Sequence, residues 1–333
     1  MMGGMFDEFK GLVSREEKQQ KTALDFVLDG EAKVIEKYVD AKPPLFDYEQ
    51  YELYELILEE TREKLQGTVP SPELIQTYVS SRENQNEDRE AIIRGMYSAS
   101  LLEIMCTTES DAYISIDGKG KVWNYLFLHV KHAKNITVKN IKGDFILACA
   151  GSRNGNVAYV LLDTIEGEET LSNAGDKGRI EHVLLNNVKG NKTLSWAGTQ
   201  GYVQYLIMNN VAGKDILRYV GERGGMVKDV TIKNSSESYY VFKELFSDGS
   251  VDYFIFSNSK TEFSFCKSKK KSKLNVSPFQ DGPKAPIKES QKETLAKIVW
   301  LTESMSALSF EEQKKMHDEI ARLQIKLFEE ERE

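Results

Sequence analysis

The stretch VLLNNVKGNKTLSWAGTQGYVQYLIMNNVAG, from Val183 to Gly213, contains nearly the same eight-residue motif twice. Its beginning, VLLNNVKG, and its end, LIMNNVAG, place two equivalent asparagines, Asn187 and Asn210, 23 residues apart. A motif that recurs at a fixed period of this length is typical of proteins that stack one structural unit on the next. The stretch therefore indicates one unit of a longer repeat.

The motif continues on both sides of this stretch at intervals of 23 or 24 residues. Each unit is anchored on an asparagine, replaced once by threonine: Asn140, Thr164, Asn187, Asn210, Asn234 and Asn258. The positions four and two residues before every anchor are aliphatic or aromatic, which is the period-two alternation of a short strand. Glycines three residues after the first four anchors, and nine residues before the last five, mark sharp corners.

A unit of 23 or 24 residues is too short for a pair of helices, but it fits one coil of three short strands and three turns. When such coils stack about 4.8 Å apart, each strand pairs in parallel with its copy in the next coil. Equivalent side chains then lie on top of one another. The asparagines are expected to form a hydrogen-bonded ladder along one corner, and its members are Asn140, Asn187, Asn210, Asn234 and Asn258.

This pattern resembles the right-handed parallel β-helix of the pectate-lyase-like superfold. The resemblance covers residues 110–261 and implies a mainly β protein of six to seven coils. Residues 1–109 carry amphipathic helical patterns and are expected to cap or cover the coils. Residues 262–289 are rich in Lys, Ser and Pro and predict an exposed loop. Residues 290–333 predict a helical hairpin.

One column departs from the alternation of apolar and polar residues. The position three residues before the anchor points outward in a strand, yet it holds four large aliphatic side chains: Leu161, Leu184, Ile207 and Ile255. These four residues are named the apolar strip. An exposed strip of this kind is a liability, so we expect a cover. An amphipathic helix of the same chain is favoured, and a second copy or a partner protein is the alternative.

Two further columns are candidate binding residues. Arg153, Lys177 and Arg223 stand at one corner of successive units and are either an anion-binding ridge or a solvated surface. Trp196 and Tyr219 stand in another column, below Cys149 and Asn173. If that column faces solvent, the two rings form a platform for a sugar ring or a protein loop. If it faces inward, they fill the core.

The sequence predicts no catalytic residues, no metal and no cofactor. The outward position before each anchor holds a single carboxylate, Asp163, which is not a paired acid and base. His129 and His132 are three apart on an expected strand and face opposite sides. Cys106, Cys149 and Cys266 are odd in number and widely spaced, so they are expected to be free thiols.

The net charge of −8 and the missing apolar spans argue against nucleic acid and membrane partners. The N-terminal residues lack the apolar segment of a secretory signal, which predicts a cytoplasmic protein. We expect a non-enzymatic β-solenoid scaffold or protein-interaction module, with a protein partner or self-association through the flanking helices. In its arrangement the chain also resembles the SUF-type iron–sulfur assembly scaffolds, the first alternative. The second is an intracellular carbohydrate-binding or carbohydrate-active protein.

Overall fold

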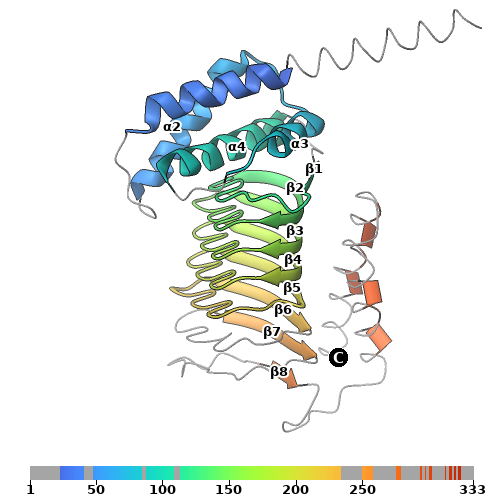
Figure 1. Ribbon diagram of the computed structural model, residues 1–333. Helices are drawn as coiled ribbons and strands as arrows, with labels where there is room; N and C mark the ends of the chain where they lie inside the picture. The colour runs from blue at the N-terminus through green and yellow to red at the C-terminus, as the bar shows by residue number, and fades with distance from the viewer. Residues whose placement is uncertain are drawn as a thin grey trace, which may run out of the picture.

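The computed structural model describes residues 23–40, 48–84, 88–108, 113–233, 250–257 and 275–278, together with single helical residues between 293 and 323. Among these residues, no helix combines the length and the apolar character that are needed to cross a membrane. The chain forms a column of stacked coils with helices across one end (Figure 1).

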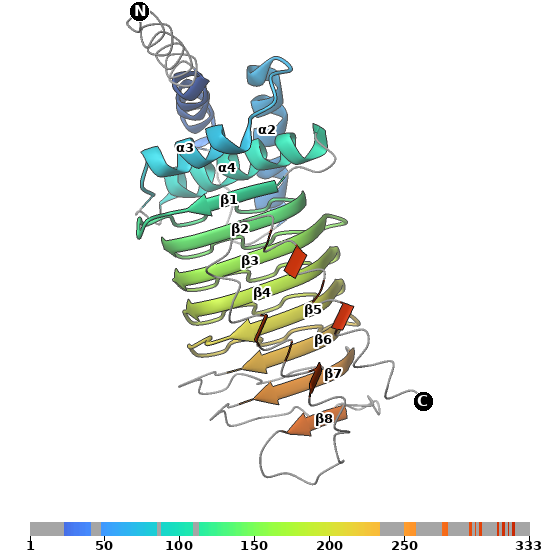
Figure 2. The same cartoon turned by 90° about the vertical axis from the view of Figure 1, so that its right-hand side faces the viewer.

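The column is a parallel β-solenoid, as the repeat predicts. Every strand pairs in parallel with the next along the chain, and the register places Leu161 beside Leu184 and Leu184 beside Ile207. Figure 2 shows the resulting sheet face-on. The strands are β1 (Tyr113–Asp117), β2 (His132–Lys142), β3 (Asn156–Glu166), β4 (Arg179–Lys189), β5 (Tyr202–Asn209), β6 (Met226–Lys233), β7 (Ser250–Ser257) and β8 (Asn275–Pro278).

The coil count differs from the prediction. Residues 113–233 run continuously from β1 to β6 and form roughly five coils, fewer than the six to seven that the repeat predicts. Strands β7 and β8 extend the sheet in the same register. The residues that link β6 to β7 and β7 to β8 lie outside the described residues.

The coil itself is built differently from the three strands and three turns that we expected. Each complete coil has one strand, bent near its end where the anchor residue adopts a left-handed conformation, as at Asn187 with φ of 54°. The rest of the coil, here named the turn stretch, is a series of consecutive β-turns such as residues 167–178. Every second residue there has positive φ, including Glu169, Leu171 and Asn173 at 53°, 55° and 54°.

Hydrogen bonds between coils stabilise this unusual backbone. In one turn stretch, the N–H groups of Glu169 and Asn173 donate to carbonyls of the following coil, while that of Leu171 donates to the preceding coil. A left-handed conformation costs a non-glycine residue roughly 1–2 kcal/mol. Here the cost is offset because each residue with positive φ gains a bond to a neighbouring coil and alternate ones, such as Leu171, bury their side chains.

Glycine is required where stacked turns touch. A Cβ atom added to Gly190 would lie 1.7 Å from the carbonyl oxygen of Gly167, and one added to Gly167 would lie 1.8 Å from that of Gly143. These contacts are with backbone atoms, which cannot move aside without breaking the stack. The glycine column after the anchor is therefore a consequence of the spacing between coils.

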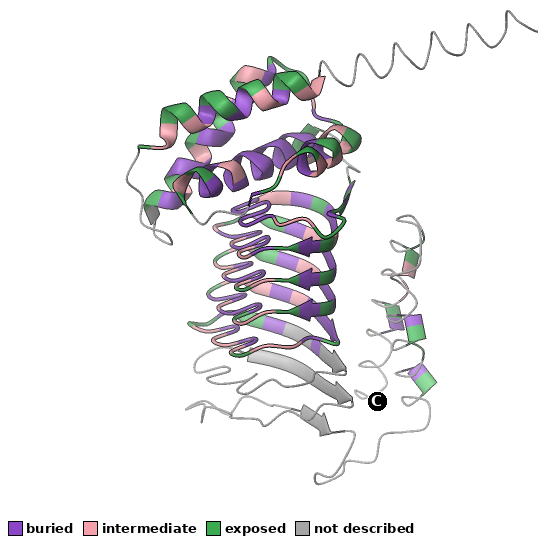
Figure 3. Cartoon of the chain, in the orientation of Figure 1, coloured by how far each residue is buried: buried purple, intermediate pink, exposed green. Residues whose placement is uncertain are grey.

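The N-terminal helices cap one end of the solenoid. Residues 23–38 are helical, followed by α2 (Tyr48–Leu65), α3 (Pro72–Ser81) and α4 (Arg89–Thr108). Helix α4 lies across the first coil and is buried along most of its length (Figure 3). Ser98 Oγ accepts a hydrogen bond from the Phe127 N–H, and the buried Glu103 carboxylate accepts from the Lys131 N–H and the Tyr54 hydroxyl. The cap thus satisfies backbone groups that the first coil would otherwise expose.

Residues near the C-terminus cover the apolar strip. Leu161, Leu184 and Ile207 are buried in one cluster with Leu301 and Leu323, and Met316 packs against it. Lys297 Nζ forms an ion pair of 2.6 Å with Glu319 Oε1, which joins the described helical residues near Leu301 to those near Leu323. The strip is therefore covered by the same chain. Ile255 continues the strip along the backbone of β7, but its side chain lies outside the described residues.

Candidate functional site

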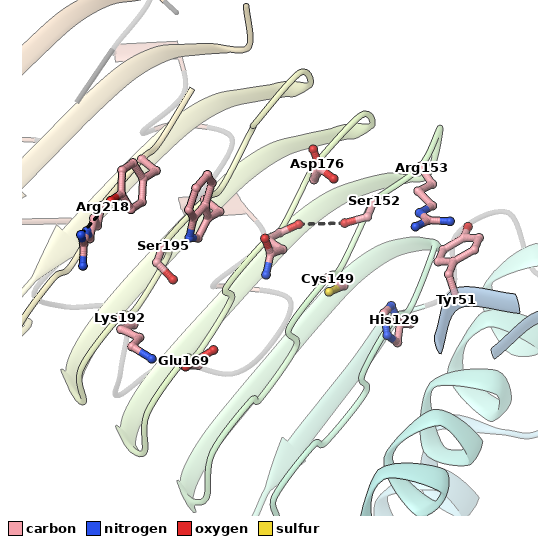
Figure 4. A pocket seen from close by; sticks show the side chains of 13 residues that line it. Tyr51, His129, Cys149, Ser152, Arg153, Glu169, Asp176, Lys192, Ser195 and Arg218 are labelled. Atoms are coloured by element: carbon pink, nitrogen blue, oxygen red, sulfur yellow. Dashed lines mark hydrogen bonds and ion pairs between the residues drawn. The ribbon is translucent and has the colours of Figure 1, made fainter. Parts of the chain in front are cut away.

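A groove of about 390 Å³ runs along the face formed by the stacked turn stretches (Figure 4). It starts at Tyr51 of helix α2 and ends at Tyr219, so it spans several coils. Its volume falls in the range of small-molecule sites. The groove lies on a different face of the coil from the covered apolar strip, because its lining comes from the turn stretches instead of the strands.

The groove owes its shape to one column of side chains. Its members are equivalent residues of successive turn stretches, each with positive φ: His129, Cys149, Asn173, Trp196 and Tyr219. These five residues are named the groove column. Rings stand at its two ends, and the small side chains of Cys149 and Asn173 stand between them. Since the levels of His129 and Trp196 are three coils apart, the gap between them spans about 14 Å.

His129 closes the groove at the capped end. It is 5% exposed, and its Nε2 lies 3.0 Å from Gln50 Oε1 on helix α2. Because an amide oxygen only accepts hydrogen bonds, Nε2 carries the proton and Nδ1 is an acceptor. This Nδ1 is buried and has no hydrogen-bond partner within the described chain. Burial, followed by the nearby charge of Arg153, lowers the pKa of His129 to about 3, so the ring is neutral near pH 7.

Tyr51 and Arg153 complete this end of the groove. The Tyr51 ring meets the His129 ring edge-on at 5.9 Å, and the Arg153 guanidinium lies over Tyr51 at 4.6 Å from the ring centre. Figure 4 shows these three side chains together beside the helical cap. The sequence indicated Arg153 but not Tyr51, since no local pattern connects a helix residue with a turn far along the chain.

Trp196 and Tyr219 form the other end. Their rings stack at 4.1 Å with an angle of 27° between the planes, and both side chains are half-buried in the lining of the groove. The structure thus places this column outward, the first of the two alternatives that the sequence left open. Tyr219 belongs to the coil after that of Trp196, so its ring covers the face of the indole that is turned toward that coil. The other indole face is turned toward the level of Asn173.

The three basic corner residues stand at equivalent positions of their coils, and all three lie close enough to Asp176 for their charges to act on its carboxyl group. Arg153 lines the capped end of the groove. Arg223 is exposed and lies over the Trp196 ring at 5.8 Å. Lys177 is exposed and is not part of the groove lining.

Polar groups line the middle of the groove. Lys192 and Glu169 form an ion pair of 2.6 Å at one side, and Ser195 also lines the groove. Asp176 stands at the other side, where partial burial raises the pKa of its carboxyl group. The charges of Lys177, Arg153 and Arg223 oppose this shift. Burial raises the pKa of the Cys149 thiol to about 12, so this cysteine is not a nucleophilic thiolate.

The asparagines form a hydrogen-bonded ladder on the strand side. Asn210 Nδ2 donates to Asn187 Oδ1, and Asn187 Nδ2 donates in turn to Asp163 Oδ1. A second, parallel series runs from Asn209 through Asn186 to the same Asp163 oxygen. Asn140 donates to Asp117 in the first coil. Asn234 and Asn258 lie outside the described residues.

The ladder accounts for the outward carboxylate that the sequence singled out. Asp163 is buried and accepts two amide hydrogen bonds, which is a structural role. Among the described residues, no group of three or more His, Cys, Asp and Glu side chains is arranged to hold a metal ion. Cys106 lies on α4 and Cys149 in the groove, while Cys266 lies outside the described range.

Comparison of the chain with protein-family models, with curated proteins and with solved structures gave no match. The groove must therefore be interpreted from its own geometry.

Proposed function

We propose that this protein is a non-enzymatic binding scaffold whose groove holds a ligand ring against Trp196. The observation that carries the proposal is the gap in the groove column. The solenoid supplies stacked rings at Trp196 and Tyr219, and the next two levels hold only Asn173 and Cys149. A flat ring placed at the level of Asn173 continues the stack, with one indole face as its contact surface.

The alternatives receive less support from the same geometry. The apolar strip, which was the expected surface for a partner protein or a second copy, is covered by Leu301, Met316 and Leu323. A catalytic function would require an activated group in the groove. Cys149, however, is a protonated thiol, and His129 is too weak a base near pH 7. The hypothesis of an iron–sulfur assembly scaffold would require a group of cluster ligands, and the described residues offer none.

A blocked variant tests the proposal. In Asn173→Trp an indole fills the gap, and the backbone tolerates it because Trp196 has the same left-handed conformation in the next coil. The full chain and this variant are screened by thermal shift against a mixed library of saccharides, nucleotides, amino acids and aromatic acids. Lys119→Trp is the matched control, because Lys119 is exposed, has the same left-handed conformation with φ of 52°, and lies outside the groove.

The proposal expects compounds that raise the melting temperature of the wild type and of Lys119→Trp, but not that of Asn173→Trp. A library in which no compound distinguishes the blocked variant from the control would overturn it.

A further inference from the structure

We propose that the ligand of the groove is a neutral sugar, with one pyranose ring stacked on the open face of Trp196. The inference rests on the proposed function and names its ligand class. Three independent features of the groove lead to it: the indole face, the acceptors around the gap, and the pairing of its charges.

The indole face suits the apolar side of a pyranose ring. The stack with Tyr219 holds the Trp196 ring nearly parallel to its neighbour at 27°, so the indole plane lies across the groove. A ring carrying C–H bonds on one face places their partial positive charge against the negative face of the indole. Because Tyr219 and the coil fix Trp196, little side-chain entropy is lost when the ligand binds.

Acceptors are placed around the same gap. His129 Nδ1 is buried without a partner in the described residues and lines the groove. The half-buried Asp176 carboxylate is a further acceptor, near which Lys177, Arg153 and Arg223 place positive charge. The Asn173 amide and Ser195 hydroxyl both donate and accept. Buried acceptors favour a ligand with several donors that point in different directions. The hydroxyl groups around a pyranose ring meet this requirement.

The backbone and the charge argue against a nucleotide. Backbone groups of the turn stretches are used in hydrogen bonds between coils, as for Asn173 and Trp196, so few remain to read the edge of a base. Lys192 is paired with Glu169 and Arg218 with Asp215, while Arg153 acts together with Lys177 and Arg223 on Asp176. A phosphate would have to compete with these carboxylates for the cations, which reduces its electrostatic gain.

The test is a glycan array with the full chain, followed by calorimetric titration of neutral oligosaccharides of glucose, galactose and mannose. Uronic acid oligosaccharides and adenine and uridine nucleotides are titrated in parallel. We expect a neutral oligosaccharide to bind. We expect Trp196→Ala to weaken that binding about tenfold or more, and Asp176→Asn to weaken it measurably. Trp300→Ala is the matched control, since Trp300 is exposed and outside the groove, and it should bind like the wild type.

Circular dichroism and thermal melting establish that each variant is folded. The inference is overturned if no neutral sugar binds the wild type, or if Trp196→Ala binds the sugar as tightly as Trp300→Ala. It is also overturned if only nucleotides or only acidic glycans bind. If a nucleotide or an acidic glycan binds and Asn173→Trp excludes it, the proposed function is still supported although the neutral-sugar inference is overturned. The two proposals can therefore be refuted separately.

Discussion

Replacing Leu184 by alanine tests whether the apolar strip is a docking surface for the C-terminal residues. Leu184 is 1% exposed and lies in one cluster with Leu301 and Leu323. Leu→Ala changes at buried sites cost roughly 2–5 kcal/mol. We expect the lower part of that range, about 2–3 kcal/mol, because the cavity opens at an interface that relaxes more easily than the inside of a coil.

The cost should fall on the docking of the C-terminal residues and not on the solenoid. Strand β4 keeps its hydrogen bonds to both neighbours, and its inward residues, such as Leu185, remain fully buried. A loss of 2–3 kcal/mol corresponds to local opening that is about 30- to 150-fold more frequent. Hydrogen exchange followed by mass spectrometry measures this in peptides that contain Leu301 and Leu323.

The comparison variant is Leu185→Ala, which has the same chemistry one residue away but on the inner face of the coil. It should accelerate exchange in peptides from β3 to β5. The reasoning is refuted if Leu184→Ala leaves exchange at Leu301 and Leu323 unchanged, or if it accelerates exchange in β3–β5 as much as Leu185→Ala does.

Three further predictions concern the cap and the coils. The pKa of His129 in the folded protein, about 3, lies below its unfolded value, so the contribution of His129 to stability should be fully present above about pH 6.5. As the pH decreases below that value, the free energy of unfolding should fall by up to about 1.4 kcal/mol per pH unit. Urea unfolding between pH 4 and 7 should show a shallower loss for His129→Phe. Glu103→Leu should lower the free energy of unfolding by about 3 kcal/mol or more, because the Tyr54 hydroxyl and a backbone N–H lose their acceptor. Glu103→Gln keeps an acceptor and should cost less in the same assay. Equal costs would contradict the capping role. Gly190→Ala should lower the melting temperature by several degrees, since its Cβ would collide with the Gly167 carbonyl; an unchanged melting temperature would contradict the close stacking of the turns.

The sequence predicted the stacking register because only one alignment of the repeat units places the anchors, the glycines and the apolar positions on top of one another. The neighbours Leu161, Leu184 and Ile207 follow from the spacing of the anchors alone, and the strand ladder pairs these residues. The period-two alternation also indicated that these side chains point outward and need a cover. Which residues supply the cover could not be read from the repeat, because amphipathic helices flank it on both sides.

The backbone conformation of the turn stretches could not be predicted by the same reasoning. Positive φ at Leu171 and Trp196 has no signal in residue preferences, since both residue types avoid this conformation. The conformation is stabilised by hydrogen bonds to other coils, which a local pattern does not contain. For the same reason the orientation of Trp196 stayed open, and the contact between Gln50 and His129 was not foreseen.

The groove and the solenoid share a physical origin. At the outward positions of the turn stretch, the backbone conformation and its hydrogen bonds are the same whether the residue is Cys149, Asn173 or Trp196. The side chain there can therefore change in size without disturbing the coil. Two large rings in succession stack on each other, and two small residues in succession leave a gap with a ring at its end. The proposed binding site thus lies in the column where the repeat tolerates variation, while the anchors, glycines and inward leucines hold that column in place.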